Sequence, residues 1–120
     1  MTFTAEFKIK YLSPVLLVAD LERAVQWYHG LGFETEFTFG GFYAALRKDG
    51  FFLHLKVADV RRKKPTAEHV DLVLSMGGVG ELYEALNGAG LEIVQPLRKM
   101  PYGLEFYVAD LDGYVLAFVD

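Results

Sequence analysis

The order of predicted elements in this chain occurs twice, and this repeat is the feature that most limits how the chain can fold. Residues 13–55 read as a strand, a helix, the triplet Leu-Gly-Phe and a hairpin with an Asp-Gly turn at 49–50. Residues 69–119 read as a strand, a helix, the triplet Ala-Gly-Leu and a hairpin with an Asp-Gly turn at 112–113. A repeated unit is typical of folds in which neither unit closes its core alone. The sequence therefore predicts two matched halves, with a binding site where the halves face each other.

The first half is predicted to be βαβββ. An apolar, β-rich run at 13–18 precedes Asp20, whose carboxylate can cap the first turn of a helix. Apolar residues three and four apart give that helix one apolar face, and Gly30 and Gly32 end it. Residues 33–39 then alternate between aromatic or Thr and polar side chains, which indicates a half-exposed strand. The Asp-Gly turn joins two further strands into a hairpin.

The second half repeats this order. Strands are predicted at 69–74 and 91–97, with a helix between them that begins after the glycines at 77–78. A loop at 99–103 leads into the closing hairpin. The fold class is therefore α+β, with two βαβββ modules that form cupped mixed sheets with the helices outside. We expect one domain made of module 1 (11–58) and module 2 (69–120), joined by a linker (59–68).

The bulk composition excludes several classes of function. A length of 120 residues and an apolar content of 52% suit one globular domain with its own core. The formal net charge of −4 argues against a nucleic-acid partner. The basic residues at 61–64 read either as an anion-binding patch or as a solvated linker, and the acidic balance favours the linker. Cysteine is absent, which removes disulfides, thiolate metal ligands and a Cys nucleophile.

Targeting signals are not recognisable in this sequence. The first twelve residues hold no apolar stretch of signal-peptide length, and no apolar run approaches the length of a transmembrane helix. We therefore expect a cytoplasmic protein without a membrane partner. No P-loop, dinucleotide-binding or Ser-His-Asp pattern is present, which sets aside phosphoryl and hydride transfer.

Two segments resemble a known family. PVLLVADLERAVQWYHGLGFE at 14–34 resembles the first strand and helix of the vicinal-oxygen-chelate superfamily, which includes glyoxalase I, extradiol dioxygenases, fosfomycin-resistance transferases and bleomycin-resistance proteins. PYGLEFYVADLDGYVLAFV at 101–119 is similar to its closing hairpin, where Asp-Pro-Asp-Gly-Asn is usual. The resemblance covers nearly the whole chain. It implies the fold but leaves the function open, because one scaffold hosts many chemistries.

The resemblance also implies four metal-ligand positions, and these fall on Ser13, His54, His69 and Ala117. Metal-dependent members use carboxylate and imidazole groups there and leave open positions for a bidentate oxygen substrate. Ala117 has no donor atom, and a Ser hydroxyl is a poor ligand for a divalent transition metal. A catalytic site normally needs three protein ligands. We therefore expect no metal or other cofactor, although His54 and His69 with water would hold a metal weakly.

This departure points to the metal-free branch, typified by bleomycin-resistance proteins that bind and sequester a drug. Their Pro-Trp-Gly-x-x-Glu-Phe loop resembles Pro-Tyr-Gly-Leu-Glu-Phe at 101–106, which is one residue shorter. In that branch two chains of a homodimer build each groove together, so the resemblance implies a homodimer and a small-molecule ligand. An acidic Glu105 beside Tyr102 suits a cationic ligand through charge and cation–π contact, and a solvent-facing strand Glu is the alternative.

The first hairpin offers a second group of candidate ligand-binding residues. A two-residue Asp-Gly loop places Ala45 opposite His54 and Arg47 opposite Phe52. Strand alternation then puts Tyr43, Arg47, Phe52 and His54 on one face. This face is predicted to be an aromatic wall with a histidine and an arginine. The alternative is that Phe52 and Tyr43 pack against a helix.

The histidines also allow two interpretations. His54 and His69 are either hydrogen-bonded core residues or a pair that faces the cavity, as donors or as an acid/base couple. They are the only candidates for catalysis. We favour metal-independent binding of a small aromatic or amphipathic molecule such as an antibiotic. The alternative is a metal-dependent lyase, isomerase or dioxygenase that uses His54 and His69, and a third possibility is a regulatory partner domain.

Overall fold

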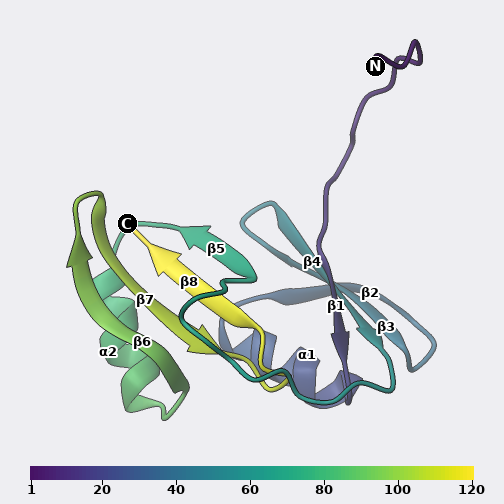
Figure 1. The fold of residues 1–120 in the computed structure, drawn as a ribbon. Helices are drawn as coiled ribbons and strands as arrows, with labels where there is room; N and C mark the ends of the chain where they lie inside the picture. The colour runs from purple at the N-terminus through teal and green to yellow at the C-terminus, as the bar shows by residue number, and fades with distance from the viewer. The chain divides into compact units, whose positions relative to one another are not determined.

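The computed structural model describes all 120 residues, which divide into two compact units, unit 1 (1–58) and unit 2 (59–120). Each unit contains one helix and one four-stranded sheet with a single parallel strand pair (Figure 1). The predicted α+β fold of two βαβββ modules is therefore confirmed. Neither helix is long and apolar enough to cross a membrane.

Unit 1 has a sheet in the order β1-β4-β3-β2. Its elements are β1 (Val15–Val18), α1 (Leu21–Gly30), β2 (Glu34–Phe39), β3 (Tyr43–Lys48) and β4 (Phe51–Val57). Asp20 caps α1 as predicted, since its Oδ1 accepts the backbone N–H of Arg23 at 3.1 Å. β3 and β4 form the predicted hairpin, and positive φ angles of 52° at Asp49 and 82° at Gly50 produce its tight two-residue turn.

Helix α1 packs against β2, β3 and β4 and covers one face of this sheet. Side chains of β1 and of the middle of β4 alternate in burial, so one set meets the helix and the other does not. The buried set consists of Ala24 and Tyr28 from α1 and of Leu16, Val18, Ala44, Leu46, Leu53 and Leu55 from the strands. Each fully buried Leu or Val stabilises the fold by about 1.5–3 kcal/mol relative to an exposed one.

Unit 2 has the same plan, with strand order β5-β8-β7-β6. Its elements are β5 (Leu72–Ser75), α2 (Val79–Gly88), β6 (Glu92–Met100), β7 (Gly103–Ala109) and β8 (Val115–Val119). Helix α2 packs on β6 and β7, where Phe106 stacks on Phe118 at 5.0 Å and contacts Tyr83 at 5.2 Å between ring centroids.

Two boundaries in unit 2 differ from the sequence-based prediction. β6 continues to Met100 and β7 begins at Gly103, so only Pro101 and Tyr102 of the predicted loop at 99–103 lie outside the strands. β5 begins at Leu72, so His69 lies before the strand rather than at its start. Just before the strand, the Asp71 N–H donates to the Val115 carbonyl at 2.8 Å, and the Asp71 carboxylate accepts the Val115 N–H at 2.8 Å.

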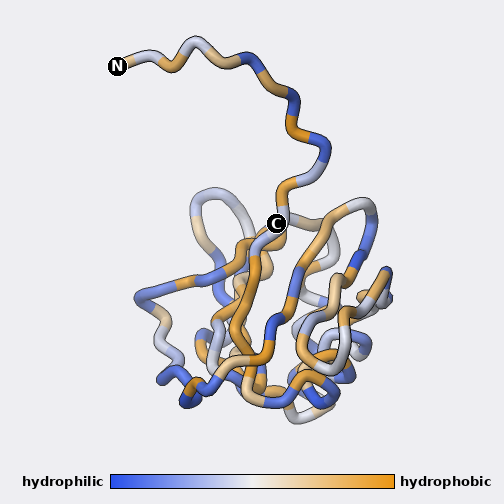
Figure 2. Tube along the Cα trace, turned by 90° about the vertical axis from the view of Figure 1, so that its right-hand side faces the viewer, coloured by the Kyte–Doolittle hydropathy of each residue, from blue (hydrophilic) through white to orange (hydrophobic).

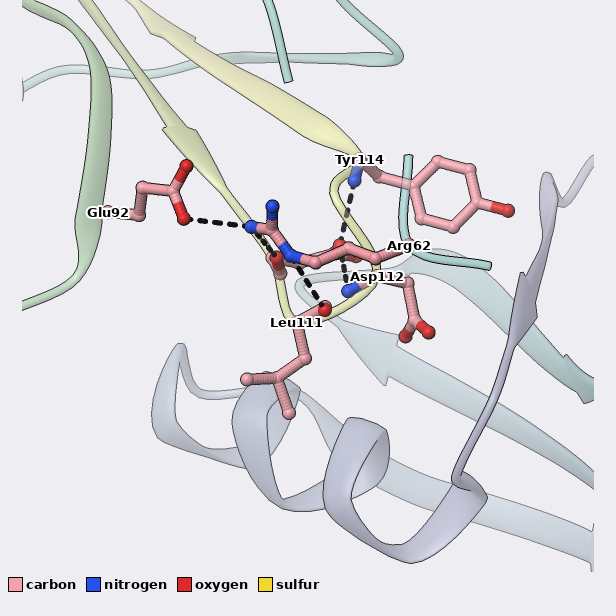
Figure 3. A network of polar contacts seen from close by, with 6 residues as sticks. Arg62, Glu92, Leu111, Asp112 and Tyr114 are labelled. Atoms are coloured by element: carbon pink, nitrogen blue, oxygen red, sulfur yellow. Dashed lines mark hydrogen bonds and ion pairs between the residues drawn. The ribbon is translucent and has the colours of Figure 1, made fainter. Parts of the chain in front are cut away.

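The predicted solvated linker is bound to unit 2 by part of its basic cluster. Arg62 donates from Nε to the carbonyl of Leu111 at 3.2 Å and from Nη2 to Glu92 at 2.8 Å (Figure 3). Lys63 donates to Asp71 at 2.9 Å. The linker therefore holds the loop between β7 and β8, and the interpretation as a purely solvated segment was incomplete.

The linker passes so close to this loop that Gly113 has no room for a side chain. Gly113 has a φ of 84°, and a Cβ there would come within 2.0 Å of the Lys63 carbonyl oxygen. Gly50 has a similar φ of 82° but open space around it. We expect Gly50→Ala to lower the free energy of unfolding by about 1 kcal/mol. Gly113→Ala is expected to cost about 3 kcal/mol or more, because backbone must move. Urea unfolding of the two variants measures this, and equal losses would contradict the role of the linker contact.

Candidate functional site

The face of the unit 1 sheet that α1 does not cover carries the first group of candidate residues. The register is as predicted, with Ala45 opposite His54 and Arg47 opposite Phe52. The same alternation adds residues from the two edge strands, since Val15 pairs with His54 and Phe37 pairs with Ala45. We call this surface the open face of unit 1, made of Val15, Phe37, Phe39, Tyr43, Arg47, Phe52 and His54.

His54 lies at the centre of the open face and is half-buried. Its Nδ1 is 2.5 Å from the hydroxyl of Tyr43, and its ring meets Phe37 edge to face at 6.0 Å between centroids. When the Tyr43 hydroxyl donates to Nδ1, the neutral imidazole carries its proton on Nε2. Nε2 makes no hydrogen bond within the protein. His54 therefore presents one oriented polar atom within an aromatic surface.

The aromatic residues around His54 are more exposed than a folded core requires. Phe37 and Phe39 on edge strand β2 are 47% and 66% exposed, and Val15 on the opposite edge is 48% exposed. Phe52 is half-buried, because Tyr11 packs on it with ring centroids 4.7 Å apart. Exposed aromatic side chains grouped on one face are typical of surfaces that bind a ligand or another protein.

The face of the unit 2 sheet away from α2 is different in character. Tyr107, Val115 and Ala117 form a small apolar cluster there, with Val70, Val94 and Val119 packed against it. Ala117 holds the place in unit 2 that His54 holds in unit 1, four residues after the Asp-Gly pair. This face therefore has an apolar centre without an imidazole.

Glu105 adds a buried charge to the unit 2 face. Its side chain is only 2% exposed and accepts hydrogen bonds from Arg98 Nε at 2.7 Å, from Tyr107 at 3.0 Å and from the Tyr102 hydroxyl. Burial acts to raise the pKa of Glu105, but the hydrogen bonds from Tyr102, Arg98 and Tyr107 outweigh it and lower the pKa below its ordinary value. The hydrogen bond to Glu105 raises the pKa of Tyr102.

The carboxylate that was predicted to attract a cationic ligand is thus already engaged. Both of its oxygens have partners within the protein, and Arg98 supplies the compensating charge. A cationic ligand at Glu105 would have to compete with Arg98. Arg98 and Glu105 flank the Pro101-Tyr102 turn with the spacing of a cross-strand pair, and the register pairs them. Sequence reasoning missed Arg98, although this spacing could have found it.

The lowered pKa of Glu105 has a measurable consequence. A carboxyl group whose pKa falls on folding contributes stability above its ordinary value of 4.5, and the contribution is lost as the pH falls through the lowered pKa. We expect Glu105→Gln to lower the free energy of unfolding by about 2 kcal/mol at neutral pH. The difference in the free energy of unfolding between the unaltered protein and Glu105→Gln should shrink as the pH falls below 4.5. Urea unfolding across that pH range tests this, with Glu84→Gln on the exposed surface of α2 as the control.

The four family ligand positions do not fit a three-ligand metal centre. Ala117 carries no donor, and Ser13 offers only a hydroxyl. His54 has one ring nitrogen bonded to Tyr43. His69 is 70% exposed, with Nε2 3.3 Å from Asp71 Oδ1. No three His, Asp or Glu side chains gather in an arrangement that suits a metal ion.

The structure brings together some of the predicted site residues. Tyr43, Arg47, Phe52 and His54 share the open face of unit 1, whereas Tyr102 and Glu105 are hydrogen-bonded in unit 2. His54 and His69 belong to different units, so their action as a pair stays a prediction. Phe37 was missed because a register irregularity between Thr35 and Phe37 decides which face of β2 it occupies.

A family model described as the Glyoxalase/Bleomycin resistance protein/Dioxygenase superfamily matches residues 8–118 of the chain. No curated protein sequence shows a significant match. Among solved structures, TioX from Micromonospora sp. ML1 is similar, with a TM-score of 0.72 and 24% identity over 91% of this chain and 96% of that one. The fosfomycin resistance protein FosX from Listeria monocytogenes has a TM-score of 0.74 and 17% identity over 95% of this chain and 93% of its own. Because the sequence identities are below 25%, these similarities show that the chains share a fold.

Proposed function

Because this chain belongs to the Glyoxalase/Bleomycin resistance protein/Dioxygenase superfamily, we propose that it binds a small aromatic or amphipathic organic molecule without a metal ion. The observation that carries the proposal is the open face of unit 1. Exposed Phe37 and Phe39 border a half-buried His54 that Tyr43 orients through Nδ1. Small-molecule sites are mostly apolar with a few placed polar groups, and this face has that composition.

The ligand chemistry follows from the side chains of this face. An aromatic ring would gain contact with the edges and faces of Phe37 and Phe39, and pairs of aromatic rings favour offset or edge-to-face geometry. His54 Nε2 would hydrogen-bond a polar substituent, and the exposed Arg47 would suit an anionic or acceptor group at the rim. The predicted molecule is therefore amphipathic, with one aromatic part and at least one hydrogen-bonding group.

The metal-independent mode is supported by the donors at the family ligand positions. Ala117 and Ser13 supply no strong ligand, and His54 lies among apolar neighbours, Val15 and Ala45, in the strand register. The protein would act by holding its ligand out of solution, as a sequestering antibiotic-resistance protein does. The fold shared with FosX, a fosfomycin resistance protein by name, makes antibiotics a sensible first class to screen.

The proposal also includes a ligand-binding surface on unit 2 itself, at which Tyr102 and His69 would touch the ligand and Glu105 would act through its hydrogen-bonded neighbours. Tyr102 is 56% exposed and is held by Glu105, so its ring offers a fixed aromatic surface. Glu105 acts there as the residue that positions Tyr102 and Arg98. The exposed His69 would provide a hydrogen bond to a polar group of the ligand.

The amphipathic aromatic dye 8-anilinonaphthalene-1-sulfonate is a suitable first probe for the open face. We expect Phe37→Ala and His54→Ala each to weaken its binding about 10-fold, because each removes a central contact worth about 1–1.5 kcal/mol. The matched control is Phe51→Ala, since Phe51 is an exposed phenylalanine of the same sheet but belongs to the alternation set that α1 covers. Fluorescence titration measures the affinities, and equal losses in all three variants would contradict the assignment of the face.

Metal dependence is tested on the same protein. Binding of the dye, and thermal shifts with aromatic and cationic antibiotics, should be unchanged in EDTA. Metal analysis after incubation with Ni, Zn, Mn or Fe(II) and desalting should find no stoichiometric metal. Retention of about one metal ion per chain, lost in His54→Ala, would overturn the proposal and support a metal-dependent lyase, isomerase or dioxygenase.

A further inference from the structure

The open face of unit 1 carries positive charge, although the whole chain is acidic. Arg47 belongs to this face, and Lys56 borders it because the register pairs Lys56 with Tyr43. Both side chains are exposed, and neither takes part in an ion pair or a hydrogen bond. The chain as a whole has 16 acidic and 12 basic residues. At this face, two unpaired cations thus oppose the charge of the whole protein.

The carboxylates of the neighbouring strand do not neutralise Arg47. Glu34 pairs with Arg47 in the register, but the two side chains form no ion pair. Glu36 lies at the register irregularity of β2 and pairs with no residue. Both glutamates are exposed to water, where a carboxylate attracts a nearby cation only weakly. Arg47 is therefore available to an anionic group that approaches it from the open face.

The segment before β1 brings further positive charge beside the open face. Tyr11 packs on Phe52 with ring centroids 4.7 Å apart, and Lys10 directly precedes Tyr11. Figure 2 shows this segment as an extended tube along which hydrophilic and hydrophobic residues alternate. Charges act on each other over about 8 Å at physiological ionic strength, so a lysine beside the face attracts an anion and repels a cation.

Unit 2 shows that the fold does not require the polar groups of this face. Unit 2 pairs Tyr107 with Ala117 where unit 1 pairs Ala45 with His54. By the same correspondence, the positions of Arg47, His54 and Lys56 are held in unit 2 by Ala109, Ala117 and Val119. A sheet of the same plan is therefore built with an apolar residue at each of these three positions. The cations and the imidazole of unit 1 need another explanation, and a ligand supplies one.

His54 directs a hydrogen-bond donor toward the end of the face that holds Arg47. Ala45 lies opposite His54 on β3, and it stands between Tyr43 and Arg47 in the same row of side chains. The two nitrogens of an imidazole lie on opposite sides of the ring, and Nδ1 is bonded to the Tyr43 hydroxyl at 2.5 Å. Nε2 is therefore turned away from Tyr43. Arg47 and His54 are diagonal neighbours across the hairpin, about 7 Å apart, so one anionic group can reach both.

From this arrangement we propose that the ligand of the open face is an aromatic acid whose anionic group binds between Arg47 and His54. The inference rests on the binding function proposed above and specifies its ligand class. The Arg47 guanidinium and the Nε2–H of His54 donate to the oxygens of one carboxylate, sulfonate or phosphonate group. Tyr43 is a positioning residue that holds the imidazole, and the aromatic part of the ligand lies beside Phe37. A cationic ligand is disfavoured, because it would meet like charge.

Matched probes test the charge of the ligand. Naphthalene-2-carboxylate, naphthalene-2-carboxamide and 2-naphthylmethylammonium share one ring system and differ in charge, and titration calorimetry at neutral pH measures the dissociation constant of each. We expect the carboxylate to bind about 10-fold more tightly than the amide, because charge-assisted hydrogen bonds are the stronger ones. The ammonium should bind most weakly. Equal affinities for all the probes would overturn this inference and leave the proposed function standing. If none of them binds, both are wrong.

Variants of Arg47 locate the anionic group. Arg47→Gln should abolish the preference, so that carboxylate and amide bind within about 2-fold of each other. Arg47→Glu should reverse the order and place the ammonium above the carboxylate. The matched controls are Lys48→Gln and Lys48→Glu, since Lys48 is the next residue of β3, pairs with Phe51 and belongs to the set of side chains that α1 covers. Both controls should keep the parent's order of affinities. If they change it as much as the Arg47 variants do, net charge alone causes the selectivity and the proposed site is wrong.

NMR of nitrogen-labelled histidines tests the roles of His54 and Tyr43. Naphthalene-2-carboxylate should shift the Nε2–H signal of His54 and leave that of His29, whose Nε2 is bonded to Thr35, unchanged. In Tyr43→Phe the free imidazole should populate both tautomers, and the preference for carboxylate over amide should fall below about 3-fold. An unshifted His54 signal, or a Tyr43→Phe variant with the parent's tautomer and preference, would overturn the assignment.

Discussion

The constraint on which the structure depends is that each four-stranded sheet has two faces but each module supplies only one helix. In unit 1, β1 leads into α1, and α1 packs against β2, β3 and β4, so the helix covers one face of the sheet. The leucines, valines and alanines of that face form the core. The other face receives no element from its own module. The side chains on the uncovered faces are therefore not constrained by packing against a helix of their own module.

The two modules use this uncovered face differently. In unit 1 it carries exposed aromatic rings around His54, whose orientation is set by Tyr43. In unit 2 it carries a small apolar cluster around Ala117 and a carboxylate satisfied by Arg98 and two tyrosines. A surface whose polar groups are already paired has less to offer a new ligand than one with a free imidazole nitrogen. The difference makes unit 1 the better candidate for binding.

Equivalent turns in the two modules also differ in their contacts with distant parts of the chain. The Asp-Gly pair in unit 1 is a free-standing two-residue turn. The pair in unit 2 lies in a longer loop. Arg62 and Lys63 of the preceding segment donate hydrogen bonds to carbonyl groups of this loop, and the Lys63 backbone lies next to Gly113. Sequence similarity between the modules thus gives the backbone plan but does not show which copies of a motif have acquired long-range partners.

The sequence by itself determined the features that depend on near neighbours. Residues a few positions apart determine the capping of the helix by Asp20 and the hairpin register around 49–50, because turn geometry and strand alternation are local. The family was indicated by two continuous motifs, at 14–34 and 101–119. Tertiary structure decided the rest. The start of β5, the binding of Arg62 to Leu111, and the side of β2 that Phe37 occupies depend on contacts between distant residues or on a register irregularity. Such contacts form only when the chain has folded, and no local spacing encodes them.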